Sequence, residues 1–214
     1  MERVICGRYL IEIDDNELYD IIAEAEMNAG RMEYGGAGAV LAEYGGTGEG
    51  SAAARGFTGG EVFPGSVAPV IISGNAAQFM IWGFPSLAAG RRPHINARSE
   101  TAATARTFSA AMASRRCLVP ASGYYEWKAL SAKKKEKYVF RLPGRAPIYM
   151  AGIYSGGIGG GRFAILTREA APALSEIHDR MPVIFTKESA AVWLAGSPDA
   201  IRDALTDLTF SKAS

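Results

Sequence analysis

The stretch Arg116-Cys-Leu-Val-Pro-Ala-Ser-Gly-Tyr-Tyr-Glu-Trp-Lys128 is the segment around which the rest of the chain is organised. Its two ends, Arg116–Val119 and Tyr124–Lys128, are rich in apolar and aromatic residues and predict two short strands. Pro120 and Gly123 lie between them, and both residue types interrupt regular strand pairing. We therefore expect two short strands joined by a turn.

Glu126 is the unusual residue of this stretch, because it lies inside an apolar strand between Tyr125 and Trp127. Burying an unpaired carboxylate is costly, so a carboxylate in such a place is either paired structurally or works as an acid or base. The position of Glu126 in the sequence favours the structural reading, and only the rest of the chain can change that balance.

The composition is that of an ordinary soluble globular protein, with 214 residues of which 48% are hydrophobic and 21% are charged. There are 23 Lys and Arg residues against 22 Asp and Glu residues, a net charge of +1, so a nucleic-acid site must be a local patch. No signal peptide or membrane-spanning run is recognisable, and we expect a cytoplasmic protein.

Cysteine and histidine are scarce, which limits the possible chemistry. Cys6 and Cys117 are the two cysteines and do not make a disulfide framework. His94 and His178 are the two histidines, and no clustered Cys/His spacing predicts a zinc site. Taken alone, Cys6 is more typical of a small buried apolar residue than of a nucleophile. We expect neither a metal nor a cofactor.

The flanking sequence predicts an α+β protein with many short strands and peripheral helices. Two strands paired across Gly74-Asn75 form the clearest hairpin signal. The expected strands are one from Arg8 onward, Val67–Ser73, Gln78–Trp82, Tyr138–Arg141, Ile148–Ile153 and Phe163–Thr167. A basic turn at Lys133–Lys137 is expected to be a solvated hairpin tip, with DNA contact as the lesser alternative.

Several helices are expected around these strands. Asp14 and Glu17 suggest a capped start, an apolar face follows, and Gly30 is a natural stop. The apolar face consists of Leu18, Ile21, Ile22 and Ala25. The other expected helices are Pro172–Ile177, one capped by Thr186 and ending at Leu194, and one capped by Ser197 or Asp199 and ending near Leu208. The glycine-rich segment at about 35–60 predicts a mobile insertion.

Two polar segments are candidates for binding. The segment 91–106 concentrates Arg91, Arg92, Arg98 and Arg106 among polar residues suited to phosphate contacts, although surface arginines are usually just solvated. His178 is followed by Asp179 and Arg180 in a crowded polar segment, although a lone histidine is usually structural. An exposed Trp82 could stack on a base, and a core role is at least as plausible.

Four motifs in this order and spacing resemble those of the SOS response-associated peptidase (SRAP) family. They are Cys6-Gly7-Arg8-Tyr9, Asn96-Ala97-Arg98-Ser99-Glu100-Thr101, Arg116-Cys117-Leu118-Val119-Pro120 continuing through Gly123-Tyr124-Tyr125-Glu126-Trp127, and Ile177-His178-Asp179-Arg180-Met181-Pro182. Each motif alone is weak, whereas four in order are hard to obtain by chance. The similarity runs from Cys6 to the final helix and is interrupted at the glycine-rich insertion.

The resemblance implies one α+β domain over residues 1–214, with a bifurcated, partly barrel-like, mainly antiparallel sheet flanked by helices. It implies a monomer associated with the nucleoid that binds single-stranded DNA containing abasic sites in a basic groove. It also implies attachment to the lesion through an N-terminal cysteine. Matched motif by motif, the catalytic residues are Cys6, Asn96, Glu126 and His178, and the DNA-binding residues are Arg8, Trp82, Arg98, Arg180 and, on a weaker match, Pro64.

The implied chemistry follows from functional groups. A ring-opened abasic sugar is an aldehyde, and a terminal cysteine offers an amine that forms a Schiff base and a thiolate that closes a thiazolidine ring. Glu126, with its pKa raised by the apolar strand, would suit the role of base. His178 is the candidate donor to the sugar ring oxygen. Asn96 could hold the amine or a sugar hydroxyl.

One departure from the family pattern concerns the five residues that precede Cys6. A cysteine nitrogen held in a peptide bond cannot form the Schiff base. Three hypotheses follow: self-cleavage before Cys6, translation that begins at Ile5, or loss of crosslinking with DNA binding kept. We favour the first two.

Two other functions stay open. One is a general thiol peptidase using Cys6 and His178 on protein substrates, against which no oxyanion-hole motif is recognisable. The other is a module that binds single-stranded DNA without forming a covalent bond.

Overall fold

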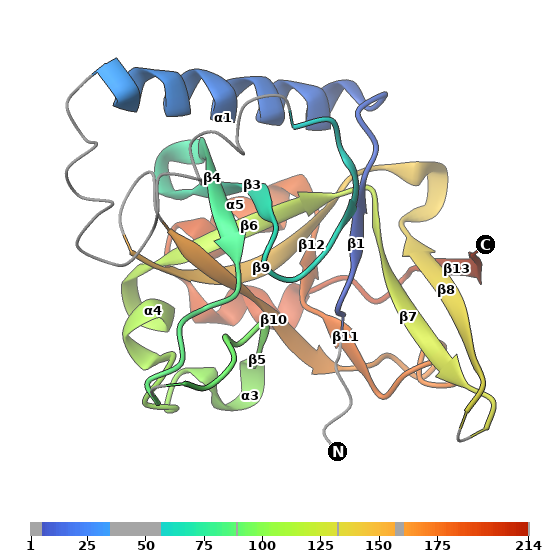
Figure 1. The fold of residues 1–214 in the computed structure, drawn as a ribbon. Coiled ribbons are helices and arrows are strands. Elements are labelled where there is room, and N and C mark those ends of the chain that lie inside the picture. Colours follow the sequence, from blue (N-terminus) through green and yellow to red (C-terminus); the bar gives the residue numbers. More distant parts are fainter. Residues whose placement is uncertain (1–5, 35–56, 89, 132, 157–160, 214) are drawn as a thin grey trace.

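The computed structural model describes residues 6–34, 57–88, 90–131, 133–156 and 161–213. These residues form an α+β fold in which two mainly antiparallel sheets lie side by side and helices pack around them (Figure 1). The expected fold class is confirmed. The expectations about residues 1–5 and about most of the glycine-rich insertion, residues 35–56, lie outside the described residues.

The smaller sheet, sheet A, has five strands and contains the second half of the organising stretch. Each of its pairings is antiparallel, with Tyr9 opposite Val62 on one side and Tyr124 on the other. The order is β13 (Thr209–Lys212), β8 (Lys135–Arg141), β7 (Gly123–Ala129), β1 (Tyr9–Ile11) and β2 (Gly60–Val62).

The larger sheet, sheet B, is partly ringed. Its order is β11 (Arg180–Pro182), β10 (Arg162–Glu169), β4 (Ala76–Trp82), β3 (Val67–Ile72), β6 (Arg116–Ala121), β9 (Ile148–Ser155) and β12 (Ile184–Phe185), and β5 (Asn96–Arg98) pairs with β10. Strand β10 also pairs with β9, so five strands form a closed circuit without making a true barrel. The β3–β4 hairpin turns at Gly74 and Asn75, both with positive φ, as the sequence predicts.

The organising stretch joins the two sheets. Strands β6 and β7 are separated by Ser122 alone and lie in different sheets, so the predicted turn at Pro120 and Gly123 is wrong. Ser122 is fixed to β1, because its N–H donates to the Leu10 carbonyl at 2.7 Å and its Oγ accepts from the Glu12 N–H at 2.7 Å. The chain therefore crosses between the sheets without reversing, and this crossing aligns β7 with β1.

Gly123 is required at this crossing, and Gly123→Ala is expected to destabilise the protein. A Cβ at Gly123 would meet the Phe140 carbonyl oxygen at 2.5 Å, and this backbone atom cannot move without disturbing β8. We expect the free energy of unfolding to fall by about 1–3 kcal/mol in urea denaturation, the usual cost of overpacking. Gly30→Ala is the control, since nothing lies within 4 Å of its Cβ and a helical glycine replaced by alanine gains about 0.5–1 kcal/mol. Equal effects of the two substitutions would contradict this account.

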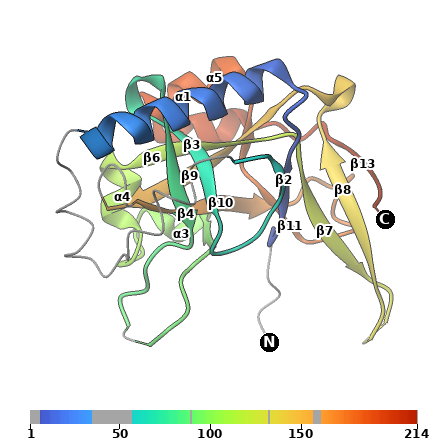
Figure 2. The same ribbon diagram turned by 45° about the horizontal axis from the view of Figure 1, so that its top comes forward.

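Helix α1 (Asn16–Tyr34) lies across one side of the fold (Figure 2). Leu18, Ile22 and Ala25 on its apolar face are buried, as expected. The cap is Asp15, whose Oδ1 accepts from the N–H groups of Glu17 and Leu18, rather than the predicted Asp14.

The other helix predictions are confirmed in one case and wrong in three. The stop at Gly30 is wrong, because its φ is not positive and good helix formers follow it. Residues 172–177 form turns rather than a helix, and Pro198–Asp203 is a short 3-10 helix followed by strand β13. Helix α5 (Lys187–Leu194) is capped by Thr186 as predicted. The short helices α3 (Ser99–Ala102) and α4 (Ser109–Ser114) complete the set.

Candidate active site and DNA-facing surface

Cys6 and Glu126 are joined directly at the start of β1. The Cys6 backbone N–H donates a hydrogen bond to Glu126 Oε1 with an N···O distance of 2.5 Å. Pairing of β1 with β7 aligns the two residues, because Tyr9 lies opposite Tyr124 and the Tyr125 N–H donates to the Arg8 carbonyl. Glu126, the carboxylate inside an apolar strand, is therefore paired with the backbone nitrogen of Cys6, the candidate nucleophile.

Burial sets the protonation of Glu126, whose side chain is 2% exposed. Desolvation raises the pKa of Glu126 to about 8, and the hydrogen bonds from the Cys6 and Trp127 N–H groups oppose this rise only in part. The negative charge of Asp179 raises the pKa further. A carboxyl group with a pKa near neutrality can both give and take a proton.

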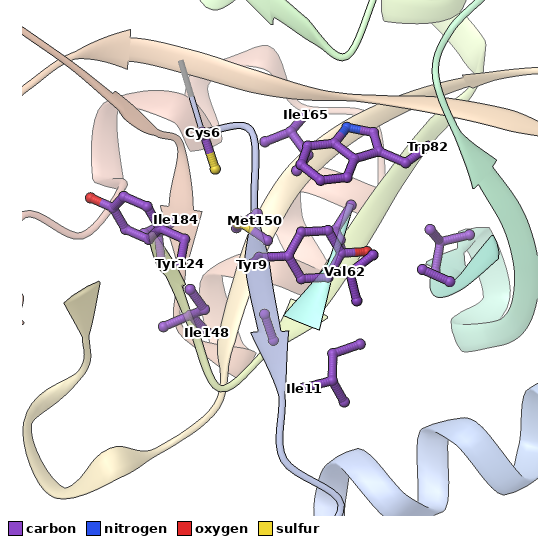
Figure 3. Packing of buried hydrophobic residues seen from close by; sticks show 14 of the residues in the cluster. Cys6, Tyr9, Ile11, Val62, Trp82, Tyr124, Ile148, Met150, Ile165 and Ile184 are labelled. Carbon is purple, nitrogen blue, oxygen red and sulfur yellow. The ribbon is translucent and has the colours of Figure 1, made fainter. Parts of the chain in front are cut away.

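The Cys6 side chain is enclosed. Figure 3 shows its sulfur directed into the apolar cluster that includes Met150 and Tyr124, and the residue has no exposed surface. Desolvation, followed by the charge of Glu126, raises the pKa of the Cys6 thiol well above its usual value. The φ of Cys6 is 42°, in the left-handed region that costs a non-glycine residue about 1–2 kcal/mol.

His178 lies in the segment that faces β7. Its Nδ1 accepts a hydrogen bond from the Arg180 N–H at 3.1 Å, which assigns the proton of a neutral ring to Nε2. Asp179 Oδ1 also lies 3.0 Å from Nδ1, but this carboxylate is 74% exposed, so we take the backbone contact as the one that sets the tautomer. Lys128 on β7 pairs with Glu176 at 3.1 Å and ties this segment to the strand that carries Glu126.

The Asn96 and Arg180 motifs meet at the end of β10. Thr167 of β10 lies opposite Arg98 of β5 in one pairing and opposite Pro182 of β11 in another. Ile165, two residues earlier, lies opposite Asn96. In Figure 3 the same Ile165 lies beside Trp82 in the cluster that contains Cys6. Two segments about 80 residues apart in sequence are thus brought together at the end of β10.

The two candidate phosphate-binding arginines differ in availability. Arg98 is exposed, and none of the ion pairs among the described residues involves it. Arg180 donates to both carboxylate oxygens of Glu100, at 2.7 and 2.8 Å, and to the Thr167 carbonyl at 2.8 Å. Any phosphate must compete with Glu100 for Arg180, whereas Arg98 is ready to bind one.

Arg8 belongs to a cluster of alternating charges on sheet A. Its Nη1 lies 2.9 Å from Glu61 Oε2, and its guanidinium lies over the rings of Phe63 and Trp127. Lys137 contacts the other oxygen of Glu61 at 2.6 Å. Burial raises the pKa of Glu61, but the Lys137 hydrogen bond and the two positive charges outweigh it and leave the pKa below its usual value. Glu61 therefore stays ionised and holds both cations.

Two other candidates have contrasting positions. Trp82 is fully buried, its ring packs against Tyr9 and Phe163, and its Nε1 donates to the Ile95 carbonyl at 2.9 Å. This packing agrees with the core role that the sequence left open for Trp82, and its base-stacking role stays a prediction. Pro64 is exposed in the turn after β2, next to Phe63, so its predicted role at the lesion stays a prediction.

The described residues contain no group of three or more His, Cys, Asp and Glu side chains that could hold a metal ion. None of the helices within these residues is long and apolar enough to cross a membrane.

The family model for the SOS response associated peptidase (SRAP) matches residues 5–213. The chain belongs to the SRAP family. The match begins one residue before Cys6 and contains all four motifs recognised in the sequence of this SRAP chain.

The matches to curated relatives cover about half of this chain. The chain in turn spans about half the length of the bacterial relatives that it matches. The chain is 36% identical over 119 residues to the abasic site processing protein YedK of Escherichia coli, which is 54% of this chain and 53% of YedK. It is 37% identical over 105 residues to the abasic site processing protein YobE of Bacillus subtilis, 47% and 48% of the two chains. HMCES of Xenopus tropicalis, also named an abasic site processing protein, is 27% identical over 51% of this chain and 40% of HMCES.

Solved structures share the fold. A protein from Bacteroides thetaiotaomicron superposes with a TM-score of 0.63 at 24% identity, covering 72% of this chain and 78% of that one. A phage-related protein from Bordetella bronchiseptica gives a TM-score of 0.61 at 26% identity, covering 72% and 81%. These likenesses extend the fold assignment to most of the chain.

Three acidic residues of the site had no role in the sequence reading. Glu61 holds Arg8, Glu100 holds Arg180, and Asp179 raises the pKa of Glu126. Glu100 and Asp179 lie within the recognised motifs, and their position in these motifs could have identified them as site residues. Glu61 lies outside the motifs, and its partner is 53 residues away.

Proposed function

We propose that this SRAP protein processes abasic sites in single-stranded DNA by forming a covalent thiazolidine crosslink through Cys6. The observation that carries the proposal is the 2.5 Å contact between the Cys6 nitrogen and the buried carboxyl group of Glu126. This contact satisfies a buried carboxyl group, and it also places an acid or base on the nitrogen that would attack the lesion. An amine that attacks an aldehyde needs such a group to accept and return its protons.

The reaction balances without any oxidant or cofactor. The free amine of Cys6 adds to the aldehyde of the ring-opened sugar, and loss of one water gives the imine. The sulfur then adds to the imine carbon while the thiol proton passes to the nitrogen, which closes a five-membered ring. Glu126 moves the protons, and ring closure within one residue gains a large effective molarity. His178, with its proton on Nε2, is the proposed donor to the sugar ring oxygen.

Exposure of the amine requires removal of residues 1–5. Hydrolysis of the Ile5–Cys6 peptide bond consumes one water and yields the Ile5 carboxylate and the Cys6 amine. The positive φ of Cys6 favours this step, because cleavage removes the torsion and its cost of about 1–2 kcal/mol. The family match starts at residue 5, which is also consistent with translation from that codon.

A single incubation tests the proposal. The protein is mixed with single-stranded DNA in which a uracil has been converted to an abasic site by a glycosylase, and the products are separated under denaturing conditions. We expect a band that joins protein and DNA, with a mass equal to the residue 6–214 chain plus the DNA minus one water. A mobility shift under native conditions with no denaturation-resistant band would instead support binding without covalent attachment.

Intact mass of protein expressed from its natural gene tests the removal of residues 1–5. A mass that corresponds to a chain starting at Cys6 is expected. A chain that keeps all five residues and still forms the adduct would contradict the proposed role of the Cys6 amine.

A general thiol peptidase is the weaker candidate. Such an enzyme needs a thiolate, whereas burial and the Glu126 charge hold the pKa of the Cys6 thiol well above its usual value. Cleavage of unrelated peptides by the protein, lost in Cys6→Ala, would favour this candidate.

Arg98→Glu is expected to weaken DNA binding and its dependence on salt. Arg98 is exposed beside the Asn96 strand, and replacing it removes one phosphate contact. The slope of log affinity against log salt for single-stranded DNA should fall in magnitude by about 0.7. Fluorescence anisotropy over a salt series measures this slope. Arg202→Glu, at an 83% exposed position in the 3-10 helix Pro198–Asp203, is the control that should leave it unchanged. An unaltered slope in Arg98→Glu would remove this arginine from the DNA surface.

A further inference from the structure

We propose that the tip of the β7–β8 hairpin, with Lys133, Lys134 and Lys135, is a second phosphodiester-binding site that holds the DNA strand a few nucleotides away from the lesion. This inference rests on the proposed function for the position of the strand, and it adds a contact outside the four family motifs. Its ligand is the sugar-phosphate backbone, whatever the base sequence.

The three lysines form no ion pair with an acid among the described residues, although Lys134 lies near enough to Glu136 to help lower the pKa of that carboxyl group. All three are exposed. Their neighbours differ, since Lys128 pairs with Glu176, Lys137 pairs with Glu61, and Glu136 pairs with Lys212. The net charge of the whole chain is only +1, so three adjacent exposed cations are a local concentration of positive charge.

The hairpin presents these lysines on an ordered backbone. The N–H groups of Leu130 and Ser131 donate to the Lys134 carbonyl, and Ser131 Oγ accepts from the Lys134 N–H at 3.2 Å. Leu130 is 45% exposed beside them, an apolar surface against which a base can pack. The tip thus combines cations with an apolar contact, as single-strand binding sites do.

The position of the tip matches the path of a strand attached at Cys6. Figures 1 and 2 both show the hairpin extending beyond the body of the fold at the end where β1 begins. Lys135 lies opposite Ala129 in the β7–β8 register, three residues beyond Glu126. At about 3.3 Å per residue this is about 10 Å, a distance that a single strand of a few nucleotides spans.

The same end of the fold carries the arginines of the β4–β5 region. Exposed Arg98 lies on β5, and exposed Arg91 and Arg92 precede this strand in the sequence. Strand β5 and the β7–β8 hairpin lie on opposite sides of β1 (Figure 1). A strand that crosses Cys6 is therefore bordered by cations on both sides. The tip supplies the contact on the β7 side.

Binding of undamaged single-stranded DNA of two lengths tests the inference without relying on crosslinking. One oligonucleotide is a dinucleotide, too short to reach from Cys6 to the tip, and the other has about twenty nucleotides. The variant Lys133→Ala/Lys134→Ala/Lys135→Ala should lose roughly tenfold in affinity for the long oligonucleotide near physiological salt, with a salt slope smaller in magnitude by about 1.4, as expected for two lost phosphate contacts. The ratio of long to short affinities should fall accordingly.

Two further variants make the result specific. Arg31→Ala/Lys187→Ala/Arg202→Ala removes the same charge from exposed positions on α1, α5 and the 3-10 helix, and it should leave the ratio of affinities unchanged. Replacing the three tip lysines with arginine should keep the long-strand affinity. Equal losses in the tip and control variants, or equal losses for both lengths, would overturn the inference. So would unchanged DNA binding in the tip variant, as expected if the lysines bind an acidic protein instead.

Failure of the crosslinking proposal can be distinguished from failure of the hairpin-tip proposal. If wild-type protein forms no denaturation-resistant adduct with abasic DNA but the tip variant still loses long-strand affinity, the crosslinking proposal fails and the tip contact stands.

Discussion

Cys6→Ala is expected to abolish the denaturation-resistant adduct with abasic single-stranded DNA. Without the sulfur the reaction stops at the imine, which water reverses, whereas wild-type protein closes the ring. Intramolecular ring closure by a well-oriented group corresponds to effective molarities of about 10⁵–10⁸ M, so no external thiol at ordinary concentration can replace it. We therefore expect loss of the adduct to below detection on a denaturing gel.

Reduction with borohydride separates the roles of the sulfur and the nitrogen. Cys6→Ala with a free amine should be trapped on DNA only when borohydride is present, because the reductant fixes the imine. Cys117→Ala is the matched control, since Cys117 is the other buried cysteine and lies on β6 in the core. It should crosslink like the wild type. An undiminished adduct in Cys6→Ala without reductant would refute attachment through this residue.

Glu126→Gln is expected to slow adduct formation by about 10²–10⁴-fold, the range usual for loss of a positioned acid or base. The glutamine keeps an oxygen that can accept the Cys6 N–H, but it cannot exchange a proton near neutral pH. The rate is measured by quenching the reaction at intervals and counting the crosslinked fraction. Normal affinity for undamaged DNA would show that the loss lies in the chemistry.

The same substitution should change how stability depends on pH. The folded pKa of Glu126 is about 8 against an ordinary value of 4.5, so the folded state holds a proton that the unfolded state has lost between these values. Its contribution is therefore complete below pH 4.5 and is lost as the pH rises toward 8, by up to about 5 kcal/mol at about 1.4 kcal/mol per pH unit. Glutamine mimics the neutral acid, and the stability of Glu126→Gln relative to wild type should rise over this range.

Urea denaturation at several pH values checks this sign. The wild-type sample must retain residues 1–5 by intact mass, since an ammonium group at Cys6 would favour ionised Glu126 and oppose the rise in its pKa. Unfolding of Glu126→Gln under conditions where wild type is stable would show that the carboxylate is a structural partner and would refute its role as a base.

Local sequence patterns determined several elements of the fold. The Gly74-Asn75 turn between two strands, the Thr186 cap of α5 and the apolar face of α1 each depend on residues close together in the sequence. Such signals are readable because the interactions behind them are local. The four motifs identified the SRAP family in the same way, since each is a short string.

Long-range contacts decided the rest. The organising stretch was predicted to turn at Pro120 and Gly123, yet it runs from sheet B into sheet A, because β6 pairs with β3 and β9 whereas β7 pairs with β1 in the other sheet. The sequence left Trp82 either at the DNA surface or in the core, and its neighbours Tyr9 and Phe163 place it in the core. Neither the crossing between the sheets nor the position of Trp82 could be predicted from the neighbouring residues in the sequence.

The chemistry of the site was likewise determined partly by the sequence and partly by the tertiary structure. The sequence by itself determined that a cysteine, a glutamate in an apolar strand and a histidine were present in family order. Only the tertiary structure placed Glu126 on the nitrogen of a residue 120 positions away, buried it, and set the charge of Asp179 near it. The physical reason is that a pKa depends on desolvation and nearby charge, and both are properties of the packed fold rather than of the chain.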